Sequence, residues 1–319
     1  SSGGDIRFSG MPAVIMQRPK GQLHAVGDLV LKADQIYAGT GRIFSVKSDS
    51  ATTILTQDDG GPINGSPYEA AAELTFRAPT ILQAGTVRSP LGTIGFDAYA
   101  TDEDGTGLLT FAPNSLTSVS AEGRVIPYGY TSNGDTWLDP FTGLELTTLP
   151  TKGVTIKGDI VDMRSGSVLD VSGGGNLFAR EFVPGVGGTL DWLTGYRDKD
   201  YKWVQSPQTI YAVMPGYDGN IAPLGFGRSE IGVGDKVYLS GGGGLAAGYY
   251  TLLPAEYALL PGAFRVTANH RYDGFADVRL GAISNLSDGS SIQSGYRVDG
   301  ASEARDQRAV GYHVMPGKS

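Results

Sequence analysis

Three carboxylates come closest to a catalytic arrangement in this chain. Asp159, Asp162 and Asp170 follow one another within a short stretch, and polysaccharide hydrolases use two acids that flank the bond they cleave. The offsets between the three are unequal, which favours separate polar positions at the surface over a shared groove. We therefore expect no enzyme and no catalytic residue, and a carbohydrate-cleaving protein stays an alternative.

Residue types that bind metals are scattered. His24, His270 and His313 lie far apart and match no metal-ligand spacing such as HExxH. The acidic turns Asp58–Gly61 and Asp102–Gly105 could offer oxygen atoms to calcium, but they lack the ligand spacing of an EF-hand loop. The chain has no cysteine, which removes disulfides, thiol nucleophiles and thiolate ligands together. We predict no metal site and no cofactor.

One short pattern, found three times, predicts the elements that carry these residues. It occupies Leu29–Ile36, Leu74–Ile81 and Val154–Ile160, and reads apolar, any residue, apolar, basic, small, Asp or Pro, and then Ile at once or after one residue. Alternation at period two turns the apolar residues to one face of a strand and Lys32 and Arg77 to the other. The small residue and the Asp or Pro then form a corner. Strand, corner and strand repeated along a chain are typical of a solenoid.

Composition supports an all-β chain. Glycine accounts for 48 of the 319 residues and charged residues for 18%, a balance that suits many tight turns. Apolar runs are short, and amphipathic stretches of helical length are almost absent. Phe76, Phe96 and Phe111 recur at roughly 15 to 20 residues, a spacing that one turn of a small solenoid could use. We predict a right-handed parallel β-helix (a β-solenoid), with a β-sandwich as the alternative.

Three regions follow one another along the chain. Residues 1–176 carry the repeated pattern as β-helix rungs, with an irregular excursion at 123–147. Residues 177–266 are rich in aromatic residues and prolines, and we expect an inserted or appended small β-domain there. Residues 267–319 return to short alternating strands of the β-helix kind. Gly241–Gly244 has no Lys-Ser or Lys-Thr after it, so we interpret it as a joint at a boundary and not as a phosphate loop.

The aromatic region is the best candidate for a ligand surface, because an inserted domain adds loops and concavities to a uniform scaffold. The candidate residues all have large and partly polar rings: Trp192, Tyr196, Tyr201, Trp203, Tyr217, Tyr249, Tyr250 and Tyr257. Rings of this kind could line a sugar-binding surface, and packing into a core is the alternative for them. A carbohydrate-binding protein is therefore a second functional hypothesis.

Charge and hydropathy exclude other classes of partner. The net charge is −8, whereas nucleic acids and anionic membrane surfaces require a basic face. No run of about 18 apolar residues occurs, so we expect no insertion into a membrane. The sequence starts at Ser1 without a Met or an apolar leader, which leads us to expect a mature protein or a fragment.

Several segments resemble known bacterial sequences. Val171–Gly188 is similar to a segment of the filamentous-haemagglutinin-like exoproteins that Gram-negative bacteria secrete by the two-partner route. The resemblance covers most of the chain, from Asp28 to Gly317, and its most specific part is the double Leu-Leu-Pro block in Tyr250–Phe264. Further segments of the same kind are Asn114–Ser120, Ile126–Gly129, Ser294–Arg297 and Arg305–Arg308.

The resemblance implies a long β-helical shaft that is secreted to the bacterial cell surface and serves adhesion or biofilm cohesion. The partners it implies are the outer-membrane transporter of the two-partner system and a glycan or cell-surface receptor. Some members of the family carry a toxic tip, so the stalk of a contact-dependent toxin-delivery protein is a further alternative. The NPNG-type motifs of the family's secretion domain do not occur here, which places this chain downstream of such a domain.

Overall fold

The computed structural model describes residues 4–9, 17–56, 65–100, 105–183, 231–268, 279–300 and 304–317, with shorter stretches at 186, 193, 196–197, 203–204, 209–217, 219 and 221. The chain divides into two compact units, Ser1–Ala179 and Arg180–Ser319. Among the described residues, every regular element is a β-strand except one short 3₁₀-helix. The expectation of an all-β chain is confirmed.

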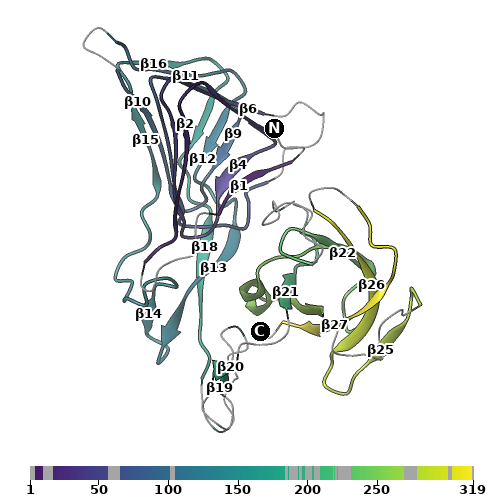
Figure 1. The fold of residues 1–319 in the computed structure, drawn as a ribbon. Coiled ribbons are helices and arrows are strands. Elements are labelled where there is room, and N and C mark those ends of the chain that lie inside the picture. Colours follow the sequence, from purple (N-terminus) through teal and green to yellow (C-terminus); the bar gives the residue numbers. More distant parts are fainter. Residues whose placement is uncertain are drawn as a thin grey trace. The chain divides into compact units, whose positions relative to one another are not determined.

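Three five-stranded parallel sheets make up most of the first unit (Figure 1). Sheet B contains β2 (Lys20–Ala25), β5 (Ile43–Ser48), β7 (Glu73–Ala78), β10 (Thr93–Ala98) and β15 (Gly153–Lys157). Sheet C contains β3 (Leu29–Ala33), β6 (Ala51–Thr56), β8 (Thr80–Ala84), β11 (Leu108–Phe111) and β16 (Ile160–Met163). Sheet A contains β1 (Ile6–Phe8), β4 (Ile36–Ala38), β9 (Thr86–Arg88), β12 (Leu116–Ser118) and β17 (Val168–Asp170). From β2 to β12, successive described strands belong to sheets B, C and A in turn, and β15, β16 and β17 repeat this order. The exception is that β6 of sheet C is followed directly by β7 of sheet B.

The copies of the repeated sequence pattern lie at different corners between the sheets. Leu29–Ile36 runs from sheet C to sheet A, whereas Leu74–Ile81 runs from sheet B to sheet C. These copies are therefore not equivalent positions of a repeat, because what they share is a strand that turns a corner into the next strand. The register partners Glu73, Thr93 and Gly153 stand at steps of 20 and 60 residues, since insertions of different length separate the strands.

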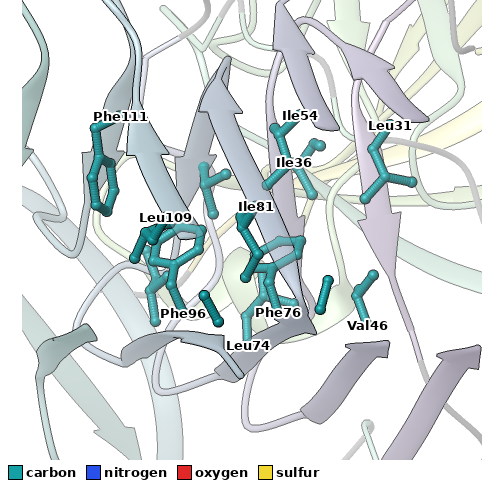
Figure 2. Close-up of a cluster of buried hydrophobic side chains, with 14 of the residues drawn as sticks. Leu31, Ile36, Val46, Ile54, Leu74, Phe76, Ile81, Phe96, Leu109 and Phe111 are labelled. Carbon is teal, nitrogen blue, oxygen red and sulfur yellow. The ribbon is translucent and has the colours of Figure 1, made fainter. Parts of the chain in front are cut away.

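The core of the first unit forms where the inward faces of the three sheets meet. Strand β7 shows the predicted alternation, with Leu74 and Phe76 buried and Arg77 exposed. The ring of Phe76 stacks on its register partner Phe96 with centroids 5.4 Å apart, and Phe96 meets the ring of Phe111 edge-on at 5.4 Å. Figure 2 shows these rings among the aliphatic side chains of the neighbouring strands. The predicted inward phase of this strand is confirmed.

A segment after β6, residues 65–72, contacts sheet A through buried polar groups. Its Glu69 carboxylate forms an ion pair with Arg7 of β1 at 2.5 Å, and the two side chains are only 2% and 9% exposed. The other carboxylate oxygen of Glu69 accepts hydrogen bonds from the backbone N–H and the hydroxyl of Thr40, which follows β4. Sheet A is thus anchored to this segment by charge as well as by packing.

An antiparallel excursion leaves the parallel sheets at residues 124–138, within the region expected to be irregular. Strand β13 (Arg124–Ser132) pairs with β14 (Thr136–Leu138) on one side and with β18 (Gly175–Arg180) on the other. Asp139 closes this part by accepting hydrogen bonds from the backbone N–H groups of Phe141 and Thr142 and from the hydroxyl of Tyr128. Burial alone raises the pKa of Asp139, but these hydrogen bonds outweigh it and hold the pKa below the usual range.

The second unit is built on a seven-stranded antiparallel sheet that curls into a half-barrel (Figure 1). The sheet order is β21 (Thr209–Val213), β24 (Phe264–Ala268), β27 (Val310–Pro316), β26 (Ser291–Val298), β22 (Lys236–Leu239) and β23 (Gly248–Thr251), with β25 (Ile283–Asn285) beside β26. The 3₁₀-helix η1 (Ala255–Leu259) precedes β24, and a separate two-stranded pair joins β19 (Tyr196–Arg197) to β20 (Trp203–Val204). The core of the second unit includes Val237, Tyr250, Val266, Tyr312 and Val314.

Two expectations about this part of the chain are wrong. The strands described within residues 267–319 do not return to the parallel sheets, because β26 and β27 pair antiparallel with each other, β26 pairs with β22, and β27 pairs with β24. Alternation at period two looks alike in either kind of sheet, and it carries no information about the partner strand. Gly241–Gly244 is no boundary joint, since it links β22 to β23 with all four φ angles positive and hydrogen-bonds to Gln293.

Burial within the columns of sheet B predicts unequal effects of one substitution. Ile94→Ala removes a fully buried side chain in β10 and should lower the free energy of unfolding by about 2–5 kcal/mol. Ile156→Ala lies in the edge strand β15, where the side chain is half-buried, and should have less than half of that effect. Denaturant unfolding followed by circular dichroism measures both, with exposed Lys157→Ala as the control. Equal losses for the two isoleucines would contradict this register.

The Glu69–Arg7 pair predicts a second contrast. Glu69→Ala leaves the buried guanidinium of Arg7 without its carboxylate and should destabilise the chain by about 3–5 kcal/mol. The matched variant is Glu73→Ala, which removes the more exposed carboxylate bound by Arg18 and should cost about 1 kcal/mol or less. Thermal unfolding of both variants measures this difference in stability. Similar shifts in Tm would mean that the Glu69–Arg7 pair does not anchor the fold.

Candidate functional site

Half of the predicted ligand-surface residues cannot be judged from their side chains. Trp192 and Tyr201 lie outside the described residues. Tyr196 and Trp203 stand in the paired strands β19 and β20, where the backbone is described but the side chains are not.

Three other predicted ligand-surface residues lie in the core or in a turn. Tyr250 points into the core of the second unit, and its hydroxyl donates to the carbonyl oxygen of Ala246 at 2.8 Å. Burial raises the pKa of Tyr250 accordingly. Tyr257 is buried in η1, and Tyr217 is half-buried at the end of a turn that begins at Met214. Core packing, the alternative considered for these rings, holds for Tyr250 and Tyr257.

Tyr249 is the predicted residue that the structure places on a surface. Its side chain is 59% exposed, and it stands in β23 opposite Tyr238 of β22, which in turn stands opposite Tyr296 of β26. Three tyrosines from three neighbouring strands therefore occupy one row across the sheet. Because side chains alternate along a strand, this row lies on the face opposite to the core residues Val237 and Tyr250. We call Tyr238, Tyr249 and Tyr296 the tyrosine row.

The rings of the tyrosine row touch one another. Tyr238 stacks on Tyr296 with centroids 5.3 Å apart and meets Tyr249 edge-on at 5.2 Å. The hydroxyls of Tyr249 and Tyr296 are hydrogen-bonded at 2.5 Å, and this bond, followed by partial burial, raises the pKa of Tyr296. Contacts between aromatic rings of this geometry stabilise their arrangement beyond simple burial. The row is thus a fixed platform of which Tyr249 is the accessible part.

Arg305 completes the cluster. Its guanidinium carbon lies 3.7 Å from the centroid of the Tyr296 ring, a cation–π contact, and its backbone bridges to Val298 at the end of β26. The residue is exposed, and the guanidinium makes no hydrogen bond or ion pair with the residues that the structure describes. The contact with the ring restricts where the guanidinium can lie and does not use its N–H groups as hydrogen-bond donors.

Tyr238, Tyr296 and Arg305 were not among the residues predicted for the ligand surface. A local signal does exist, since Tyr238 stands between Val237 and Leu239, and Tyr296 follows the small Gly295. A Cβ at Gly295 would lie 2.0 Å from the carbonyl oxygen of Tyr238, so only glycine lets β26 approach β22 this closely. These signals indicate strands, but only the pairing of β22, β23 and β26 shows that the three rings meet.

The three acids considered for catalysis do not converge. Asp162 lies in β16 of sheet C and accepts from Arg164, whereas Asp170 lies in β17 of sheet A and accepts from Ser118 and Ser172. Asp159 stands at the corner before β16 and accepts from the backbone N–H of Gly107 at 2.7 Å. Each carboxylate is engaged separately, so the arrangement offers no acid pair across a substrate.

One histidine contact combines residue types found in hydrolases but not their geometry. His313 Nε2 lies 2.8 Å from the hydroxyl oxygen of Ser290, and that hydroxyl donates to Asp288 at 2.6 Å. The serine proton is therefore held by the carboxylate, whereas a nucleophilic serine gives its proton to the histidine. Burial, and then the charge of Arg265, lower the pKa of His313, against an opposing effect of Asp288. The lowered pKa favours the neutral imidazole near pH 7.

Within the described part of the chain, no group of three or more His, Asp or Glu side chains is placed to hold a metal ion. His24 pairs instead with Asp49 at 2.9 Å. His270 lies outside the described residues, as do all of Asp58–Gly61 and, except for Gly105, all of Asp102–Gly105. No described helix has the length and hydropathy needed to cross a membrane.

The neutral state of His313 predicts an acid sensitivity. Because its folded-state pKa is below the ordinary value of 6.5, the unfolded chain binds more protons as the pH falls below about 6.5, and stability declines there. His313→Gln keeps a hydrogen-bonding group without titrating in this range, so it should flatten the change in unfolding free energy between pH 7 and pH 5.5. Denaturant titrations at several pH values test this, and parallel profiles for the two proteins would refute it.

Comparisons with known proteins complete the description of the site. No family model matches the chain, and neither the curated proteins nor the solved structures contain a significant match.

Proposed function

We propose that the chain is a structural and adhesive segment of a large secreted cell-surface exoprotein, and that its first unit is a short right-handed β-helix. The observation that carries the proposal is the stacking of three parallel sheets in a common order, with register kept from β2 to β15 in sheet B. A stack of this kind lengthens without changing its cross-section, because each strand contacts mainly its neighbours. That suits reach from a cell surface.

The second unit gives the proposed adhesin a surface for recognition. Its antiparallel sheet exposes Tyr249 of the tyrosine row and Arg305, which covers the buried Tyr296. The outer positions of sheet B, in contrast, include small and polar residues such as Gln22, Ser45 and Thr75. In this proposal the first unit supplies length and the second supplies contact. Export through the outer-membrane transporter of a two-partner system and display at the bacterial surface belong to the same proposal.

The structure supports the alternative functions to different degrees. A carbohydrate-binding protein is favoured by the tyrosine row, and it is compatible with adhesion because adhesins commonly grip glycans. A carbohydrate-cleaving protein has less support, since Asp159, Asp162 and Asp170 are engaged on different elements. The stalk of a toxin-delivery protein would use the same scaffold, and it differs only in a module that would lie elsewhere.

Adhesion can be tested with the full chain on beads. Beads coated with the folded chain should attach to cell monolayers or to biofilm polysaccharide at least about tenfold more than beads coated with the heat-unfolded chain. Equal attachment of both bead types, or none, would overturn the adhesive function. A variant with Tyr249→Ala tests whether the second unit carries the contact, since its loss of attachment should be large while Tyr99→Ala in the first unit has little effect.

A further inference from the structure

We propose that the tyrosine row and Arg305 form a binding site for acidic sugars, in which the guanidinium binds the carboxylate of a uronic or sialic acid residue and Tyr249 stacks on the sugar ring. The inference rests on the proposed adhesive function and names the ligand class for it. The ligand class is a carboxylated pyranose, because Arg305 matches the carboxylate of such a ligand and Tyr249 matches its sugar ring.

The first feature is the fixed cation. The guanidinium carbon of Arg305 lies 3.7 Å from the Tyr296 ring centroid and the residue is exposed, so the ring contact positions a guanidinium whose planar fork of N–H donors remains available to a ligand. A planar donor pair matches the two oxygens of a carboxylate, and charge-assisted bidentate contacts are about twice as strong as neutral hydrogen bonds. Lys236 stands two residues before Tyr238 in β22 and therefore on the same face. Its ammonium adds positive charge to this face.

The second feature is the exposed ring next to the cation. Tyr249 is 59% exposed although its hydroxyl is tied to Tyr296 at 2.5 Å, so the ring is accessible but does not rotate freely. An exposed aromatic face held in place can stack on the C–H face of a pyranose with little loss of side-chain entropy. One hydroxyl proton forms the hydrogen bond between Tyr249 and Tyr296. The other hydroxyl proton and the remaining lone pairs are available to the hydroxyl groups of a sugar.

The charges around the site argue for a small acidic sugar over a larger polyanion. The whole chain carries a net charge of −8, which repels nucleic acid and long polyphosphates at low salt. Asp306 follows Arg305 directly, is half exposed and interacts with Arg297 at 3.6 Å, so an acidic group stands beside Arg305 in the chain and disfavours a ligand of high negative charge. A neutral sugar would use the ring but leave the guanidinium without its counter-charge.

The test uses the full chain and calorimetric titration with tri-galacturonate and with sialyllactose. Methyl-esterified tri-galacturonate is the matched ligand without the carboxylate charge. We expect binding of at least one acidic ligand, a tenfold or greater loss on esterification, and weaker binding at higher salt. The preference between the two acidic ligands identifies the source of the carboxylate.

The variants separate the two features. Arg305→Ala and Tyr249→Ala should each weaken binding at least tenfold, Arg305→Lys should weaken it about fivefold because an ammonium lacks the planar donor pair, and Tyr249→Phe should have a smaller effect. The control is Arg77→Ala, which removes an exposed arginine that lies 5.7 Å from the Tyr99 ring in the first unit. Its affinity should equal that of the unchanged chain.

Several results would overturn the inference. Equal affinity for the esterified and acidic ligands would exclude recognition of the carboxylate, and equal losses for Arg77→Ala and Arg305→Ala would show that charge acts without a site. Absence of binding by the folded chain would exclude both sugars as ligands. If the coated beads still attach to cells with Arg305→Ala, the adhesive function stands while the acidic-sugar site fails. Unchanged far-ultraviolet circular dichroism and a cooperative thermal transition show that each variant is folded.

Discussion

Parallel pairing in a constant register is the constraint on which the first unit depends. Ladder hydrogen bonds align Val46, Phe76, Phe96 and Ile156 in one inward column of sheet B. Since side chains alternate along a strand, a slip of one residue would turn the inward set of that strand to solvent. The core is therefore a consequence of backbone pairing as much as of residue type. The register is kept between β10 and β15 although residues 99–152 lie between these two strands in the sequence.

The corners must satisfy the polar groups that this stacking buries. Gln83 occupies an inward column of sheet C between Ile54 and Phe111, where apolar residues would be expected. Its amide nitrogen donates to the carbonyl oxygens of Gly85 and Leu116 at 3.2 and 3.1 Å, so it holds the turn into sheet A. Buried polar groups are tolerated when they are paired in this way. The Glu69–Arg7 pair meets the same requirement with charges.

The second unit solves a different problem with antiparallel pairing. Strands from residues 209–213 to 310–316 close around a core of mixed aromatic and aliphatic side chains, and the opposite face is free to carry recognition. Tyr249 and Tyr296 lie far apart in the sequence, yet the pairing of both strands with β22 places their hydroxyls 2.5 Å apart. The proposed division of labour, with length in the first unit and contact in the second, follows from these two ways of pairing strands.

Local alternation in the sequence determined the all-β class and the inward phase of strands such as Glu73–Ala78. Exposure of Tyr249 agrees with the candidate surface, whereas the positions of Tyr250 and Tyr257 in the core do not. The order of the sheets, the membership of residues 267–319 and the meeting of Tyr238 with Tyr296 were decided only by the tertiary structure. The physical reason is that ladder hydrogen bonds join backbone groups, which are the same for nearly every residue type. A sequence therefore specifies that a strand forms and which face it buries, but the partner of that strand is selected by the packing of the whole chain.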